Sequence, residues 1–136
     1  MKNKEILKYI KQTLGTQPDV LFAYIHGSAL HSDNPQDIDI AVYLDPEGFG
    51  KLYRNGEVSI GFAIPMEMEL EKYLGRKVDM QVLNNAPLSF RYRVISQGLL
   101  VIDSDSNIRC DFEYLSRVEY FDFRPRRMEY LNEVMT

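Results

Sequence analysis

Two aspartates with one residue between them are the clearest chemical signal in the sequence. Asp37 and Asp39 stand in the segment Asp37–Leu44, where apolar residues alternate with others as in a β-strand. On a strand these side chains lie on one face, with Cβ atoms roughly 7 Å apart. Paired carboxylates repel each other, and Mg²⁺, which prefers hard oxygen ligands, relieves that repulsion. The pair is a candidate metal site, although a solvated edge strand also tolerates such charges.

The residues that alternate with these aspartates favour the metal site. All are apolar, as in a strand buried within a sheet: Ile38, Ile40, Val42 and Leu44. A solvated edge strand would not need an unbroken apolar face, so the carboxylates are expected at a buried sheet.

A third aspartate, Asp79, extends the candidate site. It lies early in Val78–Leu83, a second segment with strand-like alternation. If the two strands pair, they lie about 5 Å apart, and Asp79 reaches the same cation cluster. Three carboxylates around two Mg²⁺ ions support in-line displacement at phosphorus, with Asp79 as the base that takes the proton of the attacking hydroxyl.

Gly27 and Ser28 are the candidate ligand-binding turn. They follow the apolar segment Val20–Ile25, which is rich in β-formers and reads as a buried strand. A glycine at the strand exit lets the backbone approach a ligand closely. If a helical turn starts at Ser28, its free N–H groups and its hydroxyl favour phosphate. Alone the Gly-Ser pair is a weak signal, because it is common in turns.

Alternating helical and strand-like patterns surround these residues. Helices are expected at Asn3–Leu14, from about Val58 to Leu74, from the turn at Pro87 to Gly98, and from near Asn107 onward, with Pro125 kinking or dividing the last one. A fourth strand is expected at Leu99–Ile102. The pattern predicts an α/β (α+β) fold with one domain over residues 1–136. Its mixed sheet carries the three aspartates, its helices pack on one face, and a helical region occupies about 107–136.

Composition limits the classes of function. The chain has 136 residues, enough for a core without disulfides, and its one cysteine cannot form an internal disulfide. The formal net charge of −4 argues against direct nucleic-acid binding. No apolar run is long enough to span a bilayer, and the N-terminus lacks a signal-peptide core, so we expect a cytoplasmic protein.

Two clusters of charged residues have a simple structural explanation, and the arginine cluster also allows a functional one. Three glutamates lie close together in the middle of the chain and three arginines near its end: Glu67, Glu69 and Glu71; Arg124, Arg126 and Arg127. Solvated helix faces explain both clusters most simply. The alternative for the arginines is a contact surface for phosphates or an acidic partner.

The motifs together resemble a known superfamily over nearly the whole chain. Gly27-Ser28, a polar loop, Asp37-Ile38-Asp39-Ile40 and the later Val78-Asp79 are similar to the signature of the polymerase-β-like nucleotidyltransferases. The short chain and the segment from Leu83 to Asp103 are similar to the minimal nucleotidyltransferases, the MNT or MntA-type antitoxin family. This resemblance implies the polymerase-β-like fold.

The resemblance also implies an activity and a partner. Members of the MntA branch transfer AMP from ATP to a tyrosine of a HEPN-domain toxin. By analogy, Asp37, Asp39 and Asp79 hold two Mg²⁺ ions and carry the catalysis, while Gly27 and Ser28 bind the nucleotide. A hetero-oligomer with the toxin, or a homo-oligomer, is expected, and no membrane association.

The loop before Asp37 departs from the family pattern. It is slightly shorter than usual, with Leu30-His31 where an Arg-Gly is often found and Gln36 where a serine often stands. Two alternatives therefore stay open. One is transfer to a small hydroxyl compound such as an aminoglycoside, which usually requires extra chain. The other is a non-catalytic antitoxin that neutralises its partner by contact alone.

Other residues are expected to be structural. His26 and His31 read as strand-end and loop residues, and Cys110 as a core residue of the last helix. The aromatic residues of that region are interpreted as core or as a protein-binding face that accounts for association: Phe112, Tyr114, Tyr120, Phe121, Phe123 and Tyr130.

Overall fold

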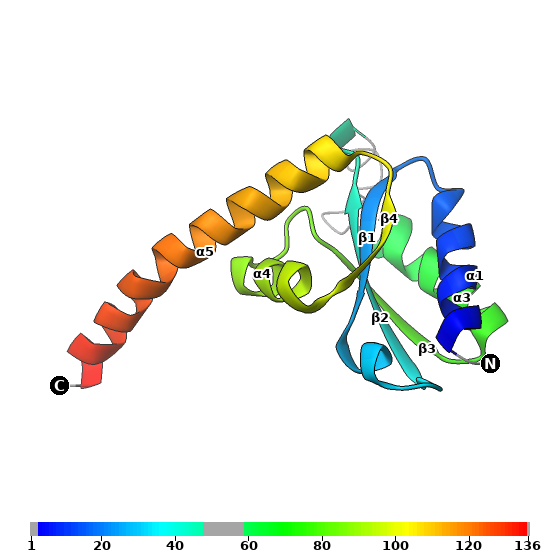
Figure 1. The fold of residues 1–136 in the computed structure, drawn as a ribbon, viewed down its shortest axis with the longest axis horizontal. Coiled ribbons are helices and arrows are strands. Elements are labelled where there is room, and N and C mark those ends of the chain that lie inside the picture. The colour runs from blue at the N-terminus through cyan, green and yellow to red at the C-terminus, as the bar shows by residue number, and fades with distance from the viewer. Residues whose placement is uncertain (1–2, 48–58, 136) are drawn as a thin grey trace.

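The computed structural model describes residues 3–47 and 59–135, with side chains over residues 3–47 and 61–122 (Figure 1). The expected start of a helix at Val58 lies outside these residues, as do the side chains of the C-terminal arginine cluster and of Tyr130. That residues 1–136 form a single domain stays a prediction.

Four strands form one mixed sheet in the order β3-β2-β1-β4. Strand β1 (Val20–His26) is antiparallel to both β2 (Asp37–Leu44) and β4 (Leu99–Asp103). Strand β3 (Lys77–Val82) pairs in parallel with β2, whose other neighbour is β1. The predicted α+β class and mixed sheet are confirmed.

Helices cover both faces of this sheet, whereas the sequence analysis expected one. Figure 1 shows α1 (Asn3–Gly15) and α3 (Ile64–Leu74) on one side and α4 (Leu88–Gln97) and α5 (Ser106–Met135) on the other. The cause is β1, whose two faces are both apolar. Ala23 and Ile25 pack in the core under α1 and α3, while Phe22 and Tyr24 pack under α4 and α5. A strand buried on both faces needs cover on both.

Two carboxylates of α3 hold the edge strand β3. Glu71 Oε1 accepts a hydrogen bond from the Val78 N–H at 2.9 Å, and Glu67 Oε1 accepts one from the Met80 N–H at 2.9 Å. These N–H groups point away from β2 and would otherwise be unpaired at the sheet edge. Glu67 and Glu71 therefore do more than form the solvated face expected from the sequence.

The loop after β3 closes against the end of β2. The side chain of Asn84 accepts a hydrogen bond from Leu44 N and donates one to Leu44 O, at 2.9 and 2.8 Å. The side-chain amide of Asn84 thus pairs with the backbone of Leu44 as the backbone of a neighbouring strand would. Pro87, expected as the first helical residue, is the N-cap of α4, so the helix starts one residue later, at Leu88.

A polar cluster ties α5 to the sheet. Glu113 Oε1 accepts hydrogen bonds from the Tyr24 hydroxyl at 2.8 Å and from Arg109 Nη1 at 2.9 Å. Arg109 Nε lies 3.0 Å from Asp103 Oδ1 at the end of β4. Burial and then the bond to Glu113 raise the pKa of Tyr24 above its usual range, so this phenol stays a donor.

The face of α5 that meets the domain differs from the expected one. Helical spacing in the sequence predicts a stripe of Ile108, Phe112 and Leu115. Ile108 and Phe112 do pack against the core, but the next buried position is Ser116, and Leu115 is exposed. Cys110, expected in the core, is exposed. Helix α5 is also not divided at Pro125, since it runs as one helix from Ser106 to Met135.

Replacing Arg109 by Met should destabilise the fold by about 1 kcal/mol, because it leaves Asp103 and Glu113 without their shared cation. Arg109 and the Ser106 hydroxyl hold the pKa of Asp103 below its ordinary value. The contribution of this ion pair to the stability of the fold is complete above the ordinary pKa of an aspartate, about 4. It is lost as pH falls through the lowered pKa of Asp103. Urea unfolding at pH 7 and at pH 3 should therefore show a smaller difference between wild type and Arg109→Met at pH 3.

Arg117→Met is the matched control for this change. Arg117 is 45% exposed and contacts Glu113 at 3.4 Å. If Arg117→Met lost as much unfolding free energy as Arg109→Met, Arg109 would not be the cation that stabilises Asp103 and Glu113.

Candidate functional site

The sheet register brings two of the three aspartates side by side. Asp39 pairs with Asp79 across the parallel β2–β3 ladder and with His26 across the antiparallel β1–β2 ladder. Asp37 lies two pairs earlier in the β2–β3 ladder, opposite Lys77. Directly opposed residues on neighbouring strands have Cβ atoms roughly 4.5–5.5 Å apart.

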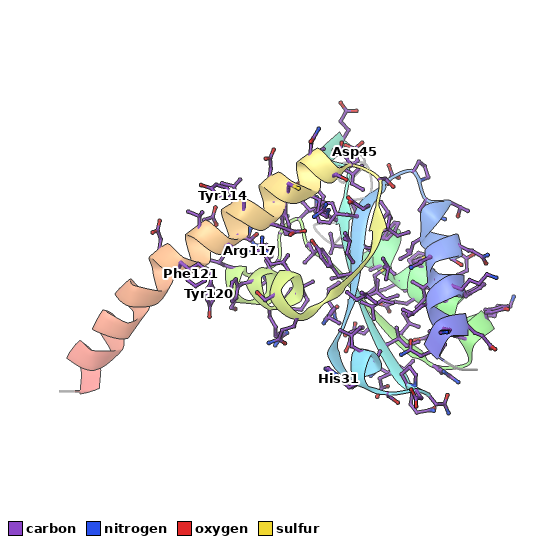
Figure 2. The ribbon with its side chains drawn as sticks, in the orientation of Figure 1. His31, Asp45, Tyr114, Arg117, Tyr120 and Phe121 are labelled. Atoms are coloured by element: carbon purple, nitrogen blue, oxygen red, sulfur yellow. The ribbon has the colours of Figure 1, made fainter. Side chains whose placement is uncertain are left out.

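The three aspartates share one face of the sheet. Ile38 and Ile40 pack in the core beneath α1 and α3, so Asp37 and Asp39 project to the side of α4. On β3 the same alternation turns Val78 and Met80 into that core and Asp79 away from it. Figure 2 labels His31 and Asp45, which lie towards opposite ends of β2, and the aspartates lie at the His31 end.

Asp39 and Asp79 line two adjoining pockets. The smaller encloses about 280 Å³ and is the more polar in character. It is lined by Ser28, Asp37, Ile38, Asp39, Lys77 and Asp79. Carboxylates, a hydroxyl and an ammonium group suit a cation and an anionic ligand bound together.

The larger pocket lies between the sheet and α4 and encloses about 420 Å³. Besides the two aspartates it is lined by His26, Gly27, Gln81, Phe90, Arg93 and Gln97. Phe90, Arg93 and Gln97 follow one another at helical spacing, so one face of α4 forms its wall. An aromatic ring beside charged and amide groups suits an organic ligand with polar ends.

Gly27 permits the close packing of Asp39. Its φ is +77°, and a Cβ built on it would lie 2.5 Å from Asp39 Oδ2. A side chain at this position would displace the Asp39 carboxylate. Gly27 therefore shapes the site by having no side chain, which refines the predicted ligand-binding role.

A hydrogen-bonded chain runs from β1 to β3. His26 Nε2 lies 3.2 Å from Gln81 Oε1, and Gln81 Nε2 donates to Asp79 Oδ2 at 2.6 Å. His26 ends β1 as expected, but it is also buried and bonded across the site. His31 lies exposed in the 3₁₀ turn η1 (Gly27–His31).

The aspartates share a face but are not arranged as a finished metal centre. Among the described residues, no three His, Cys, Asp or Glu side chains lie close enough together to hold an ion as they stand. The donor set nevertheless fits Mg²⁺, because carboxylate oxygens are the ligands this hard ion prefers. The metal assignment of Asp37, Asp39 and Asp79 stays a prediction.

Sequence reasoning missed several residues that line the pockets. Lys77 and Gln81 stand two residues before and after Asp79, so strand alternation alone places them on its face. The alternation of Gln81 was visible in the sequence, but its bond to Asp79 was not. Phe90 and Arg93 carried no signal, because nothing in the sequence shows that α4 covers this end of the sheet.

Comparisons with known proteins agree with this geometry. A protein-family model described as Polymerase beta, Nucleotidyltransferase matches residues 8–107, which include both strands that carry the aspartates. A search of curated protein sequences found no match. In the described part of the chain, no helix is long and apolar enough to cross a membrane.

Several solved structures share the fold over nearly the full chain. One is a Shewanella oneidensis tri-AMPylated HEPN toxin in complex with MNT antitoxin: 21% identity, TM-score 0.65, covering 98% of this chain and 99% of that one. A toxin–antitoxin structure with AMP-PNP gives 22% identity, TM-score 0.64 and coverage of 96% and 98%. An MntA–HepT toxin–antitoxin structure gives 21% identity, TM-score 0.61 and coverage of 96% and 97%.

Gly27→Ala should destabilise the protein by roughly 2–3 kcal/mol, since the alanine adds a clash with Asp39 to the strain of a positive φ. Gly75→Ala is the matched control. Gly75 has φ +66°, but a Cβ there would meet nothing within 4 Å. Chemical denaturation should show a loss of only about 1 kcal/mol for Gly75→Ala. Equal losses would mean that Gly27 does not cradle Asp39.

Proposed function

Because the chain belongs to the polymerase β nucleotidyltransferase family, we propose that it transfers AMP from ATP to a tyrosine of a HEPN-domain toxin, as an antitoxin. The observation that carries this proposal is the pairing of Asp39 with Asp79 on one sheet face, with Asp37 beside them and Gly27 beneath Asp39. The likeness to toxin–antitoxin complexes, one of them AMPylated, supports the choice of nucleotide and acceptor.

Asp37, Asp39 and Asp79 would hold two Mg²⁺ ions. Bound Mg²⁺ neutralises the charge that develops on the phosphates and makes the attacking hydroxyl more acidic. Asp39 lies between the other two aspartates in the register, so it is the residue placed to serve both cation positions. Its position depends on Gly27, because a Cβ built there would lie 2.5 Å from Asp39 Oδ2.

Ser28 and Lys77 would bind the triphosphate. They line the smaller pocket with the three aspartates, and both can donate hydrogen bonds to phosphate oxygens. The Lys77 ammonium offsets part of the negative charge of the carboxylates, which would otherwise repel the nucleotide. Lys77 thus joins Gly27 and Ser28 in the proposed nucleotide-binding set.

The transfer is a single displacement at the α-phosphorus. The acceptor oxygen forms a bond to this phosphorus while the bond to the pyrophosphate oxygen breaks, and pyrophosphate leaves. Asp79 accepts the hydroxyl proton, so it must lie beside the acceptor. Asp79 lines the larger pocket as well as the smaller one, which suits a residue between nucleotide and acceptor.

The exposed face of α5 is proposed as the surface that binds the toxin. The exposed apolar side chains spaced along one side of the helix are Tyr114, Leu115, Val118 and Phe121, and the ring of Phe121 also meets that of Tyr92 on α4 edge to face. Figure 2 shows Tyr114 on the side of α5 away from α4, and Tyr120 and Phe121 near the end of α4. Tyr92 and Tyr120 stack with ring centroids 3.9 Å apart and brace this part of α5. Aromatic side chains that are rigid and exposed are typical of protein interfaces.

Asp39→Asn should abolish AMP transfer while leaving the fold intact. Asparagine keeps the shape of the side chain but removes the charge that attracts Mg²⁺, and several kcal/mol of transition-state stabilisation go with it. Loss of one of three repelling carboxylates should leave the melting temperature unchanged or slightly higher. The protein and its toxin are incubated with Mg²⁺ and labelled ATP, and label on the toxin is followed beside thermal melting.

Glu69→Gln is the control for this assay, since Glu69 is exposed on α3 on the opposite side of the sheet. Equal labelling by wild type and Asp39→Asn would refute the catalytic assignment. Toxin binding without labelling by the wild type would identify a non-catalytic antitoxin. Labelling of an aminoglycoside but not of the toxin would identify a small-molecule enzyme.

Changing both Tyr114 and Leu115 to Glu should weaken toxin binding at least tenfold, because two charges replace an apolar contact. Both side chains are more than half exposed, so the fold should survive. Calorimetric titration with the toxin measures the affinity. Met68→Glu places a charge on α3 at an apolar side chain that is 65% exposed, and it should leave the affinity unchanged. A similar loss in both proteins would show that α5 is not the docking surface.

A further inference from the structure

Asp79 stands on an edge strand and is exposed, so its orientation needs a constraint from outside its own backbone. An exposed aspartate samples several rotamers, and only some of these turn an oxygen towards Asp39. The hydrogen bond of 2.6 Å from Gln81 Nε2 to Asp79 Oδ2 supplies such a constraint. It occupies one carboxylate oxygen and leaves the other for a cation or a proton.

Gln81 is in turn held by His26. The contact of Gln81 Oε1 with His26 Nε2 at 3.2 Å requires a proton on that ring nitrogen, since the amide oxygen can only accept. With its oxygen committed to His26, the Gln81 amide must present its nitrogen, a donor, to Asp79. The two bonds therefore fix the amide orientation together.

His26 itself is fixed by its surroundings. It is 8% exposed and lies at the end of β1, next to the positive-φ Gly27. Its ring meets the ring of Phe90 edge to face with centroids 5.6 Å apart, and Arg93 lies over Phe90 at 5.4 Å. A rigid strand end and α4 thus both restrain the imidazole.

We propose that His26 and Gln81 are positioning residues that hold the Asp79 carboxylate in the orientation needed for AMP transfer. This inference rests on the proposed function, because it concerns the residue that accepts the proton there. It adds two residues that line the larger pocket and act through Asp79. Outer hydrogen-bond partners of ligating carboxylates typically change activity or metal affinity by about 10–100-fold.

The variants are chosen to remove each bond while keeping volume. Gln81→Met keeps the length of the side chain and deletes both amide bonds. His26→Phe keeps a ring against Phe90 and deletes the bond to Gln81. The double variant closes a mutant cycle, and Gln12→Met on the exposed side of α1 is the matched control.

Transfer kinetics with the toxin and labelled ATP give the first readout. Gln81→Met should lower kcat about 10–100-fold with KM for ATP changed less than about twofold, because the triphosphate contacts remain. His26→Phe should lower kcat less, and the double variant should be no worse than Gln81→Met. Melting temperatures close to wild type would separate positioning from a loss of fold.

The second readout needs neither nucleotide nor metal. In the isolated wild-type protein, one side-chain amide proton of Gln81 should be shifted downfield and protected from exchange by NMR. The shift should disappear in Asp79→Ala and weaken in His26→Phe. This signal tests the hydrogen-bonded chain even if the wild type transfers no AMP, so failure of the proposed function is recognised separately.

Three results would overturn the inference. The first is a kcat of Gln81→Met equal to that of Gln12→Met, with an active wild type. The second is a double variant whose loss is the product of the single losses, which would mean that His26 and Gln81 act independently. The third is a Gln81 amide proton that does not respond to Asp79→Ala.

Discussion

The parallel pairing of β3 with β2 determines which charged groups meet. Strand β3 is an edge strand, and its outward N–H groups at Val78 and Met80 bind Glu71 and Glu67 of α3. A slip of one residue would turn Asp79 into the apolar core and Val78 towards α4. It would also leave the two glutamates without their donors. The helix therefore specifies the register, and the register sets Asp79 beside Asp39.

Because helices bury the sheet on both faces, α4 determines which part of the face that carries the aspartates stays open. The apolar part of the α4 side, with Phe22, Tyr24 and Val94, is packed and closed. Towards the His26 end the same face becomes polar, and α4 presents Phe90 and Arg93 instead of aliphatic side chains. The carboxylates thus stand at the open end of a core, where a ligand can reach them and where the strands beneath them are rigid.

Sequence patterns predicted the strands and the shared face of the aspartates, because alternation is a local property of the chain. They did not reveal what depends on distant packing. Glu67 and Glu71 looked like solvent-facing charges until the edge of β3 was known to lie against them. Leu115 fits an apolar helical stripe as well as Phe112 does, but the packing of α5 on the domain buries the small Ser116 and leaves Leu115 exposed. Phe90 and Arg93 join the site for the same reason, through the placement of a whole helix.

The order of the strands along the chain has a consequence for how the site assembles. The β1–β2 pair closes through residues 27–36, which include the turn η1, whereas Asp39 and Asp79 are separated by about 40 residues that include α3. Loop closure of that length costs about 1 kcal/mol more entropy than closure of the turn. During synthesis, a chain that has emerged only to Gly75 holds Gly27, Ser28, Asp37 and Asp39 but lacks Asp79. The complete carboxylate set exists only after the next strand has emerged and paired, so no shorter nascent chain can carry it.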